Sequence, residues 1–387
     1  MLQCDGMASN SSMQIAGEPP QDGVRAQPEP LTAPIALASY ILCCLAFIVA
    51  VTRVRNYWDM SSHWADNQAY LTIAQDAVKE RFAGPELQAI RQYYRGTGYC
   101  VALVSTLTSL PPAACLPFMA LACGALSVYL CGRLWGWRVA TLFSFINIML
   151  TQPECLGGSE PFFIVFIFAS LWLWRQKHTL SAVFFATLAT SVRPTGAFLL
   201  LAIVGVLVWH RRWREVLTSA SVVAILGTLY LIPLVFLAKD PWAPATGYAD
   251  SWYGPFPISF PFYPIIRSAL LPGNPWTRHL KVWLFLAFTI FGLVTLWKRR
   301  RQAFADPIGQ VEWAFFLLFT GFCLSFNASY GYEAYPRYSS PVVPQNLLGL
   351  QSRLLTPWVI LPMSVVAGLL SAVSALNVHT LYHLFVH

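Results

Sequence analysis

The stretch TAPIALASYILCCLAFIVAV, residues 32–51, decides the fold of this chain. It carries no charged residue, and as a helix it is long enough to cross the ~30 Å hydrocarbon core of a bilayer. Its apolar residues run continuously instead of alternating, and only helices and closed barrels satisfy their backbone hydrogen bonds in lipid. No basic segment leads directly into a short apolar core, as in a cleavable signal peptide. We therefore predict an uncleaved first transmembrane helix.

The whole chain continues this pattern. Apolar residues make up 56% of it and charged residues 11%, whereas a soluble domain carries about 25% charge. Most of its surface therefore cannot face water, and we predict an all-α polytopic membrane protein with about eleven transmembrane helices. After the first helix, the predicted spans are residues 115–131, 139–150, 161–174, 180–192, 197–209, 216–237, 282–297, 313–326, 341–350 and 357–376.

Two terminal segments flank the predicted membrane domain, which covers residues 31–376. Residues 1–30 are rich in Ser, Pro, Gly, Gln and acids without an apolar period, which predicts a disordered tail. Residues 377–387 form a short C-terminal tail. Two long loops, 53–114 and 239–281, interrupt the apolar runs. Within the first of these loops, we predict that residues 98–110 form a half-helix that enters the outer leaflet.

Clusters of Lys and Arg in short loops predict the orientation. The strongest are at residues 210–214 and 298–301, and weaker ones are near 133–138 and 175–177. Cytoplasmic loops are enriched in these residues, so the loop 53–114 and the other polar motifs fall on the outer face. Basic residues within 53–114 oppose this placement, but the rule weakens in long loops.

Two acids in the first outer loop are candidate catalytic residues. Asp66 could take a proton from an acceptor hydroxyl, or it could cap the helix that follows it. Asp59 is the second candidate base. His63 lies between them and fits a surface histidine better than a catalytic one, so we treat it as a candidate substrate contact.

Two further charged residues stand where apolar runs begin or break. Glu160 precedes an apolar span, where it could take part in catalysis or simply complement the helix dipole. Arg193 interrupts an apolar stretch at Arg-Pro-Thr-Gly, because proline disfavours helix in the residue before it. A cation at membrane depth is costly and is usually functional or paired. We therefore predict that Arg193 makes either a phosphate contact or an internal salt bridge.

The late motif Glu333-Ala334-Tyr335-Pro336-Arg337-Tyr338 lies on the same predicted face. The planar fork of Arg337 suits a phosphate, and Tyr335 suits a sugar ring or the membrane interface. We predict that Glu333, Tyr335 and Arg337 contact substrate, with an interfacial arginine in an aromatic belt as the alternative.

Several classes are disfavoured. No His, Cys and Asp cluster has convincing metal-ligand spacing, and no phosphate-binding glycine loop or nucleotide-binding fold is visible. The nine cysteines form no paired framework. The net charge of +8 comes mainly from short loops, so it indicates topology and attraction to anionic membrane lipids instead of nucleic acid.

The order of these parts resembles the GT-C superfamily of polytopic glycosyltransferases, which use polyprenyl- or dolichyl-phosphate sugars. The likeness covers residues 32–349. It includes an outer loop with Asp66 and Tyr70, and a half-helix with Gly98, Tyr99, Pro111 and Pro112. The motifs Ser159-Glu160-Pro161-Phe162, Arg193-Pro194-Thr195-Gly196 and Tyr335-Pro336-Arg337-Tyr338 are similar to the GPI mannosyltransferase II type and its bacterial relatives.

The resemblance implies transfer of a hexose, with mannose as first choice, to an unknown acceptor on the outer face. Asp66 would act as base or orient the acceptor, Tyr70 would contact substrate, and Arg337 would hold the lipid phosphate. The presence of both Asp59 and Asp66 leaves the base open. No cofactor is demanded, although a divalent ion could bridge either acid to the phosphate. Without a soluble C-terminal domain, acceptor recognition falls to the loops or to a partner subunit.

Two other classes compete with an enzyme: a transporter or flippase of a lipid-linked sugar, and a non-catalytic scaffold. Transporters usually contain internal repeats and mid-membrane charges, whereas here no repeat is visible and the charges lie near span ends. We expect the bacterial inner membrane, with the endoplasmic reticulum as the alternative location.

Overall fold

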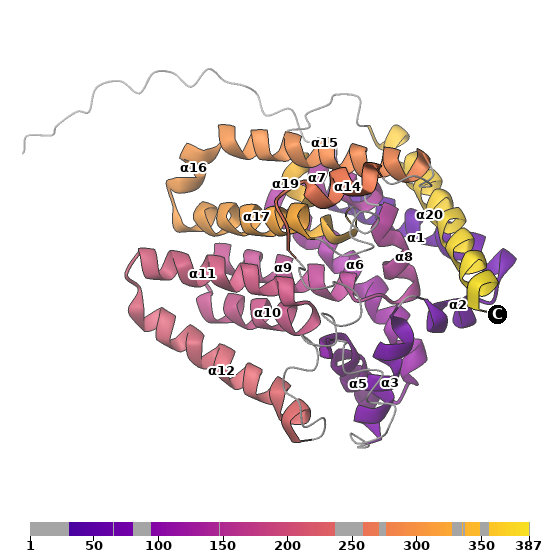
Figure 1. The fold of residues 1–387 in the computed structure, drawn as a ribbon, viewed down its shortest axis with the longest axis horizontal. Coiled ribbons are helices and arrows are strands. Elements are labelled where there is room, and N and C mark those ends of the chain that lie inside the picture. Colours follow the sequence, from indigo (N-terminus) through magenta and orange to yellow (C-terminus); the bar gives the residue numbers. More distant parts are fainter. Residues whose placement is uncertain are drawn as a thin grey trace, which may run out of the picture.

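The computed structural model describes residues 31–64, 66–79, 94–146, 148–236, 258–270, 276–326, 335, 337–348 and 356–386. Within these ranges the chain is helical and contains no strand beyond an isolated bridge between Ile258 and Phe326. Figure 1 shows the helices gathered into one bundle. The predicted all-α class is confirmed. The predicted tail 1–30 lies outside the described residues.

The first half of the chain supplies α1 (Ala33–Val54), α2 (Tyr57–His63), α3 (Asn67–Val78), α5 (Gly96–Thr108), α6 (Pro112–Trp135), α7 (Trp137–Ile146), α8 (Ile148–Leu156), α9 (Glu160–Arg175) and α10 (Thr179–Val192). The second half supplies η1 (Pro194–Gly196), α11 (Ala197–Trp209), α12 (Trp213–Phe236), α14 (Tyr263–Leu270), α15 (Trp276–Lys298), α16 (Arg300–Phe304), α17 (Pro307–Ser325), η3 (Ser340–Val342), α19 (Val343–Leu347) and α20 (Pro357–Val386).

Five helical segments are long and apolar enough to cross a membrane: α1, α6, Trp213–Ile232 of α12, α17, and Pro357–Asn377 of α20. The segments Trp137–Ile146 and Leu150–Leu156 would make a sixth span together, but their axes differ by 80°. The chain is therefore an integral membrane protein, while eleven full spans are not confirmed. The other helices lie outside this set chiefly because they are short: α10, with 14 residues, reaches only about 21 Å.

Two predicted spans differ most from the structure. Residues 341–348 form the end of η3 and the five-residue helix α19, which is far too short to cross a bilayer. The predicted span 139–150 is divided between α7 and α8 and bent. Conversely, α20 remains helical to Val386, through residues that we assigned to a C-terminal tail.

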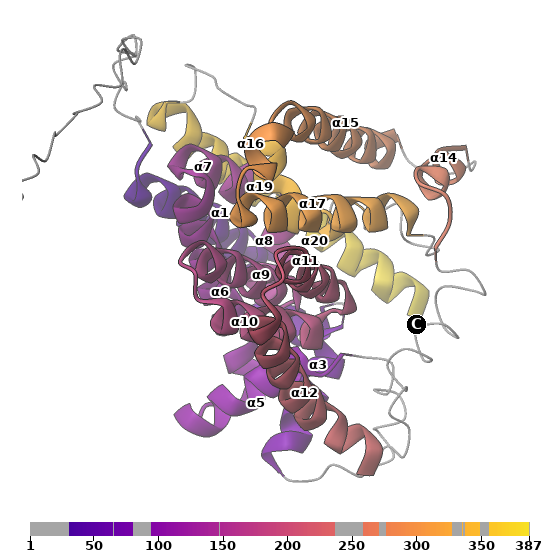
Figure 2. The same ribbon diagram turned by 90° about the vertical axis from the view of Figure 1, so that its left-hand side faces the viewer.

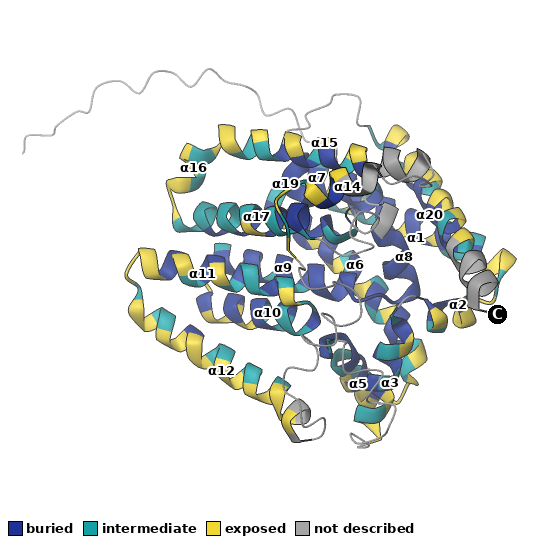
Figure 3. Cartoon of the chain, viewed as in Figure 1, coloured by how far each residue is buried: buried dark blue, intermediate teal, exposed yellow. Residues whose placement is uncertain are grey.

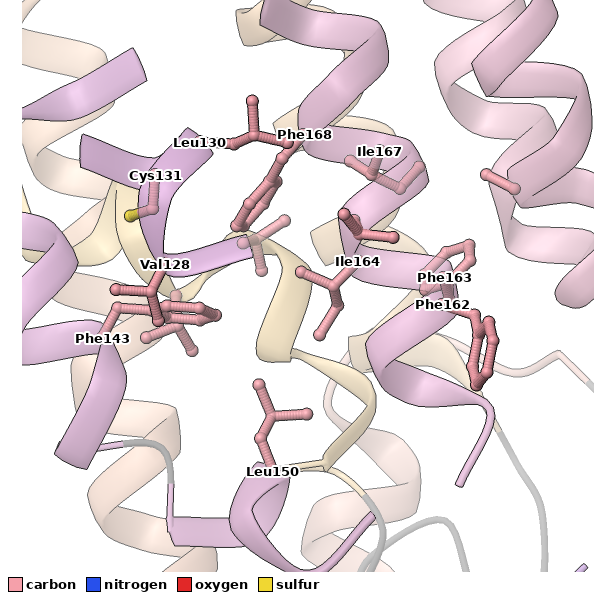
Figure 4. Close-up of a cluster of buried hydrophobic side chains, with 14 of the residues drawn as sticks. Val128, Leu130, Cys131, Phe143, Leu150, Phe162, Phe163, Ile164, Ile167 and Phe168 are labelled. Carbon is pink, nitrogen blue, oxygen red and sulfur yellow. The ribbon is translucent and has the colours of Figure 1, made fainter. Parts of the chain in front are cut away.

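The core lies around α9. Apolar side chains of α6, α7, α8 and α9 turn toward one another in Figure 4. Phe168 of α9 packs edge-on against Trp135 and also contacts Phe143, with ring centroids 5.1 and 5.8 Å apart. In Figure 3, α9 is largely dark blue, whereas α12 is mostly yellow and teal. Exposed apolar residues along α12 fit a lipid-facing helix.

Hydroxyl groups join the first and last long helices. The Oγ atoms of Ser39 on α1 and Ser364 on α20 lie 2.5 Å apart, and Ser144 of α7 donates to Ser39 at 2.9 Å. The absence of a side chain at Gly368 lets α20 approach the backbone of Cys43 closely. This small-residue interface resembles the packing that holds helices together in lipid.

The basic loops gather at one end of the bundle. Arg175, at the end of α9, makes two ion-pair contacts of 2.5 and 2.9 Å with Glu312 of α17. His210 hydrogen-bonds to Gln310 at 2.8 Å. In Figure 1 the turns from α11 to α12 and from α15 to α17 lie together on the left. Glu160 begins α9, so it lies at the opposite end, about 22 Å away along the helix axis.

Candidate functional site

A pair of glycines sets the position of Glu160. Gly157 has φ +105°, a conformation that glycine adopts without strain. At Gly158, a Cβ atom would lie 2.7 Å from Oε2 of Glu160 and would collide with Pro153. The chain can therefore turn sharply between α8 and α9, and the Glu160 carboxylate lies against the glycine backbone.

Arg193 reaches this carboxylate from the end of α10. It is extended, with φ −145° and ψ 135°, as expected for a residue before proline. Its Nη2 donates to Oε1 of Glu160 at 2.5 Å and to Oγ of Ser159 at 3.1 Å. Ser159 occupies the N-cap position of α9 but makes no capping hydrogen bond. Its hydroxyl instead holds Arg193 in place.

Arg337 approaches the same oxygen from the segment before η3. Its Nε lies 2.8 Å from Oε1 of Glu160, in ion-pair contact without hydrogen-bond geometry. The ring of Tyr338 lies 5.3 Å from the guanidinium carbon of Arg193 and 5.5 Å from that of Arg337, within cation–π range. One carboxylate and one ring therefore hold two guanidinium groups together.

This cluster stays charged although it is largely enclosed. The Glu160 side chain is 6% exposed and that of Arg337 is 25% exposed. Burial alone would lower the pKa of Arg337, but the Glu160 carboxylate outweighs it, with help from Tyr338, Asp66 and Tyr70. The pKa of Arg337 therefore lies above its ordinary value, and the group remains a cation.

Tyr70 and Asp66 bring α3 to the cluster. Tyr70 is buried and shares a hydrogen bond with Ser159. Burial and then the charge of Asp66 raise the pKa of Tyr70 well above its ordinary value, so its hydroxyl remains neutral. Asp66 is the N-cap residue of α3, yet its side chain makes no capping hydrogen bond. The alternative role as a capping side chain is thus not observed.

The structure places the predicted residues in two groups. Five come together at one end of the bundle: Asp66, Tyr70, Glu160, Arg193 and Arg337.

The other four predicted residues are not placed in this cluster. Asp59 and His63 pair with each other at 3.2 Å on α2, with side chains 59% and 48% exposed. Tyr335 points away to α15, where its hydroxyl lies 2.8 Å from Oγ1 of Thr289. The Tyr335 side chain is buried there, and its predicted substrate contact stays a prediction. Glu333 lies outside the described residues.

Sequence reasoning missed two residues of the cluster and one buried cation outside it. Ser159 and Tyr338 adjoin the predicted Glu160 and Arg337, and that adjacency was the available signal. Arg95 precedes α5 and is 3% exposed. Its Nε and Nη2 are buried without a hydrogen-bond partner. It gave no signal, because its burial depends on the tertiary packing around α5.

A resident metal ion would need several acidic, His or Cys side chains close together. Among the described residues, no three His, Cys, Asp or Glu side chains lie close enough to hold a metal ion together. The charged groups that do converge, Glu160 with Arg193 and Arg337, present more donors than acceptors. Their chemistry therefore suits an anionic oxygen ligand.

Fold and site together define an all-α integral membrane protein with a buried charge cluster at one end of its bundle. Comparison with protein-family models, with curated proteins and with solved structures finds no match to this chain.

Proposed function

We propose that this protein is a glycosyltransferase that moves a sugar from a polyprenyl-phosphate-linked donor to an acceptor on the outer or lumenal face. The observation that carries the proposal is the convergence of Arg193 and Arg337 on one oxygen of Glu160. Two guanidinium groups held at a helix end offer a preorganised site for a lipid phosphate.

Arg337 is the group proposed to bind the donor phosphate. Its side chain is partly exposed, and it remains a cation beside Glu160. When the glycosidic bond breaks, its electron pair passes to the phosphate oxygen, which gains negative charge. A fixed cation lowers the free energy of that charge in the transition state.

Asp66 is the proposed base. An acceptor hydroxyl attacks the anomeric carbon of the sugar and gives its proton to the carboxylate, while polyprenyl phosphate leaves. Glu160 is engaged by two guanidinium groups, so we assign it to positioning them. Asp59 remains the alternative base, although it is paired with His63 on a different helix. A hexose, with mannose first, and a bacterial inner membrane or endoplasmic reticulum location complete the proposal.

The test is sugar transfer by the purified protein in lipid nanodiscs, with a panel of polyprenyl-phosphate sugars. Asp66→Asn and Arg337→Ala should each abolish turnover of the preferred donor while folding, measured by circular dichroism, is retained. Asp59→Asn is the matched carboxylate control and should retain turnover. Loss in Asp59→Asn with retention in Asp66→Asn would transfer the role of base to Asp59. Turnover unaffected by Arg337→Ala would overturn the proposed phosphate site.

One observation favours a second candidate, transport of a lipid-linked sugar. The bent pair α7 and α8 breaks an apolar segment, and discontinuous helices form the binding sites of many transporters. Glu154 of α8 is also buried, beside Gly124 of α6. A liposome assay that finds donor moved across the bilayer with its sugar bond intact would favour transport over transfer.

A further inference from the structure

A cavity of about 420 Å³ lies at the basic end of the bundle, remote from the Glu160 cluster. Its walls come from α6, α9, α15, α16, α17 and α19, and include Trp135, Arg175, Arg299, Trp313 and Gln345. Such a volume is within the range of small-molecule sites. Because Arg175 and Glu160 occupy opposite ends of α9, this cavity is separate from the proposed catalytic site.

The charge of the cavity selects an anion. Arg175 and Glu312 compensate each other through their two contacts. That leaves Arg299 as the uncompensated charge among the lining residues. Its neighbours Lys298, Arg300 and Arg301 add to the positive potential. An anionic group with several oxygens, such as a phosphate, is the matching ligand.

The surroundings favour a lipid over a free ion. The cavity opens where α6 ends and α17 begins, both of which are long enough to span the membrane. Apolar side chains, including Leu134, Leu296 and Leu348, share its lining with the polar groups. Tryptophan is enriched at the level of lipid headgroups, and basic pockets between transmembrane helices bind anionic headgroups.

We infer that this cavity binds the headgroup of an anionic phospholipid, such as phosphatidylglycerol. Arg299 contacts the phosphate, and Trp135 and Trp313 lie at the level of the headgroup. The inference is independent of the proposed glycosyl transfer.

Native mass spectrometry of the delipidated full chain tests this inference, by titration with short-chain phosphatidylglycerol, phosphatidylcholine and inorganic phosphate. Phosphatidylglycerol should bind most tightly. Arg299→Ala should weaken it about fivefold, the effect of about one basic residue near an anionic headgroup. Arg301→Ala is the matched control, because Arg301 belongs to the same basic run but does not line the cavity; it should weaken binding less than Arg299→Ala does.

Arg299→Gln keeps a polar side chain and removes the charge, and it should also weaken binding. This second variant keeps the test decisive if Arg299→Ala does not fold. Equal weakening by Arg299→Ala and Arg301→Ala would overturn the site in favour of diffuse surface attraction. Equal binding of phosphatidylcholine would overturn the anionic specificity. Inorganic phosphate binding as tightly as phosphatidylglycerol would overturn the lipid assignment.

Discussion

The Nε atom of Arg337 lies 2.8 Å from Oε1 of Glu160, the oxygen that Arg193 also contacts at 2.5 Å. Glu160 begins the central helix α9, whereas Arg337 belongs to a segment near the end of the chain. A single carboxylate therefore sets the spacing of two cations from distant parts of the sequence. The predictions below separate its structural contribution from its proposed catalytic one.

Glu160→Gln should lower the free energy of unfolding by about 3–5 kcal/mol, because it removes the carboxylate that both enclosed guanidinium groups contact. Thermal denaturation in detergent measures the effect. Glu215→Gln is the control, since Glu215 pairs with Arg212 at a more exposed position, where such pairs contribute about 0–1 kcal/mol. Equal losses in the two variants would contradict the special role of Glu160.

Gly158→Ala should displace the Glu160 side chain, because the new methyl group would lie 2.7 Å from Oε2 and collide with Pro153. We expect both lower thermal stability and lost transfer activity. Gly205→Ala is the matched control. A Cβ atom there meets nothing within 4 Å, and alanine favours a helix interior by about 1 kcal/mol over glycine. A Gly158→Ala protein that behaves like Gly205→Ala would show that the close contact is tolerated.

Arg337→Lys should lower kcat for sugar transfer by about 10²–10³-fold, as for loss of one oxyanion-stabilising donor. Lysine keeps the charge but lacks the fork that could contact Glu160 and a phosphate together. Steady-state kinetics with the preferred donor measures the change. If kcat were retained while KM rose, Arg337 would bind the substrate and the transition state equally, without a specific effect on the chemical step.

Tyr70→Phe should lower turnover about fivefold through loss of the hydrogen bond to Ser159, which is worth about 1 kcal/mol. The raised pKa of Tyr70 keeps its hydroxyl protonated through neutral and mildly alkaline pH. Ionisation of this group begins only at higher pH, so the substitution should not shift the alkaline limb of the pH–rate profile. A shifted limb would show that Tyr70 titrates during turnover.

Much of the helical framework could be predicted from the chain. Apolar runs located most helices, and the predicted span from Pro161 matches α9 closely. The predicted starts at residues 115 and 313 were late, because α6 and α17 begin at Pro112 and Pro307. The break at Arg193 also followed from its proline neighbour. These features are local, so they are visible without knowledge of the tertiary packing.

The site was predictable only as a set of candidates. The basic loops predict that Glu160, Arg193 and Arg337 share one membrane face, but they do not predict that one carboxylate joins both cations. Tyr335 and Tyr338 stand in the same short motif, yet one turns to Thr289 and the other to the guanidinium groups. The direction of a side chain in a short irregular segment depends on neighbours that only the folded chain supplies. The predicted eleven spans are not confirmed for a related reason, since packed helices need not each be 20 residues long.

The hydroxyl contact between Ser39 and Ser364 has a consequence for biogenesis. A ribosome synthesises a chain from its N-terminus onward, so α1 enters the membrane long before α20 is synthesised. Until then Ser39 lacks its partner on α20, and the face of α1 that receives α20 must contact lipid or the insertion machinery. Completion of the bundle therefore waits for the last helix, and a prematurely terminated chain would offer quality-control proteases an unfinished helix interface.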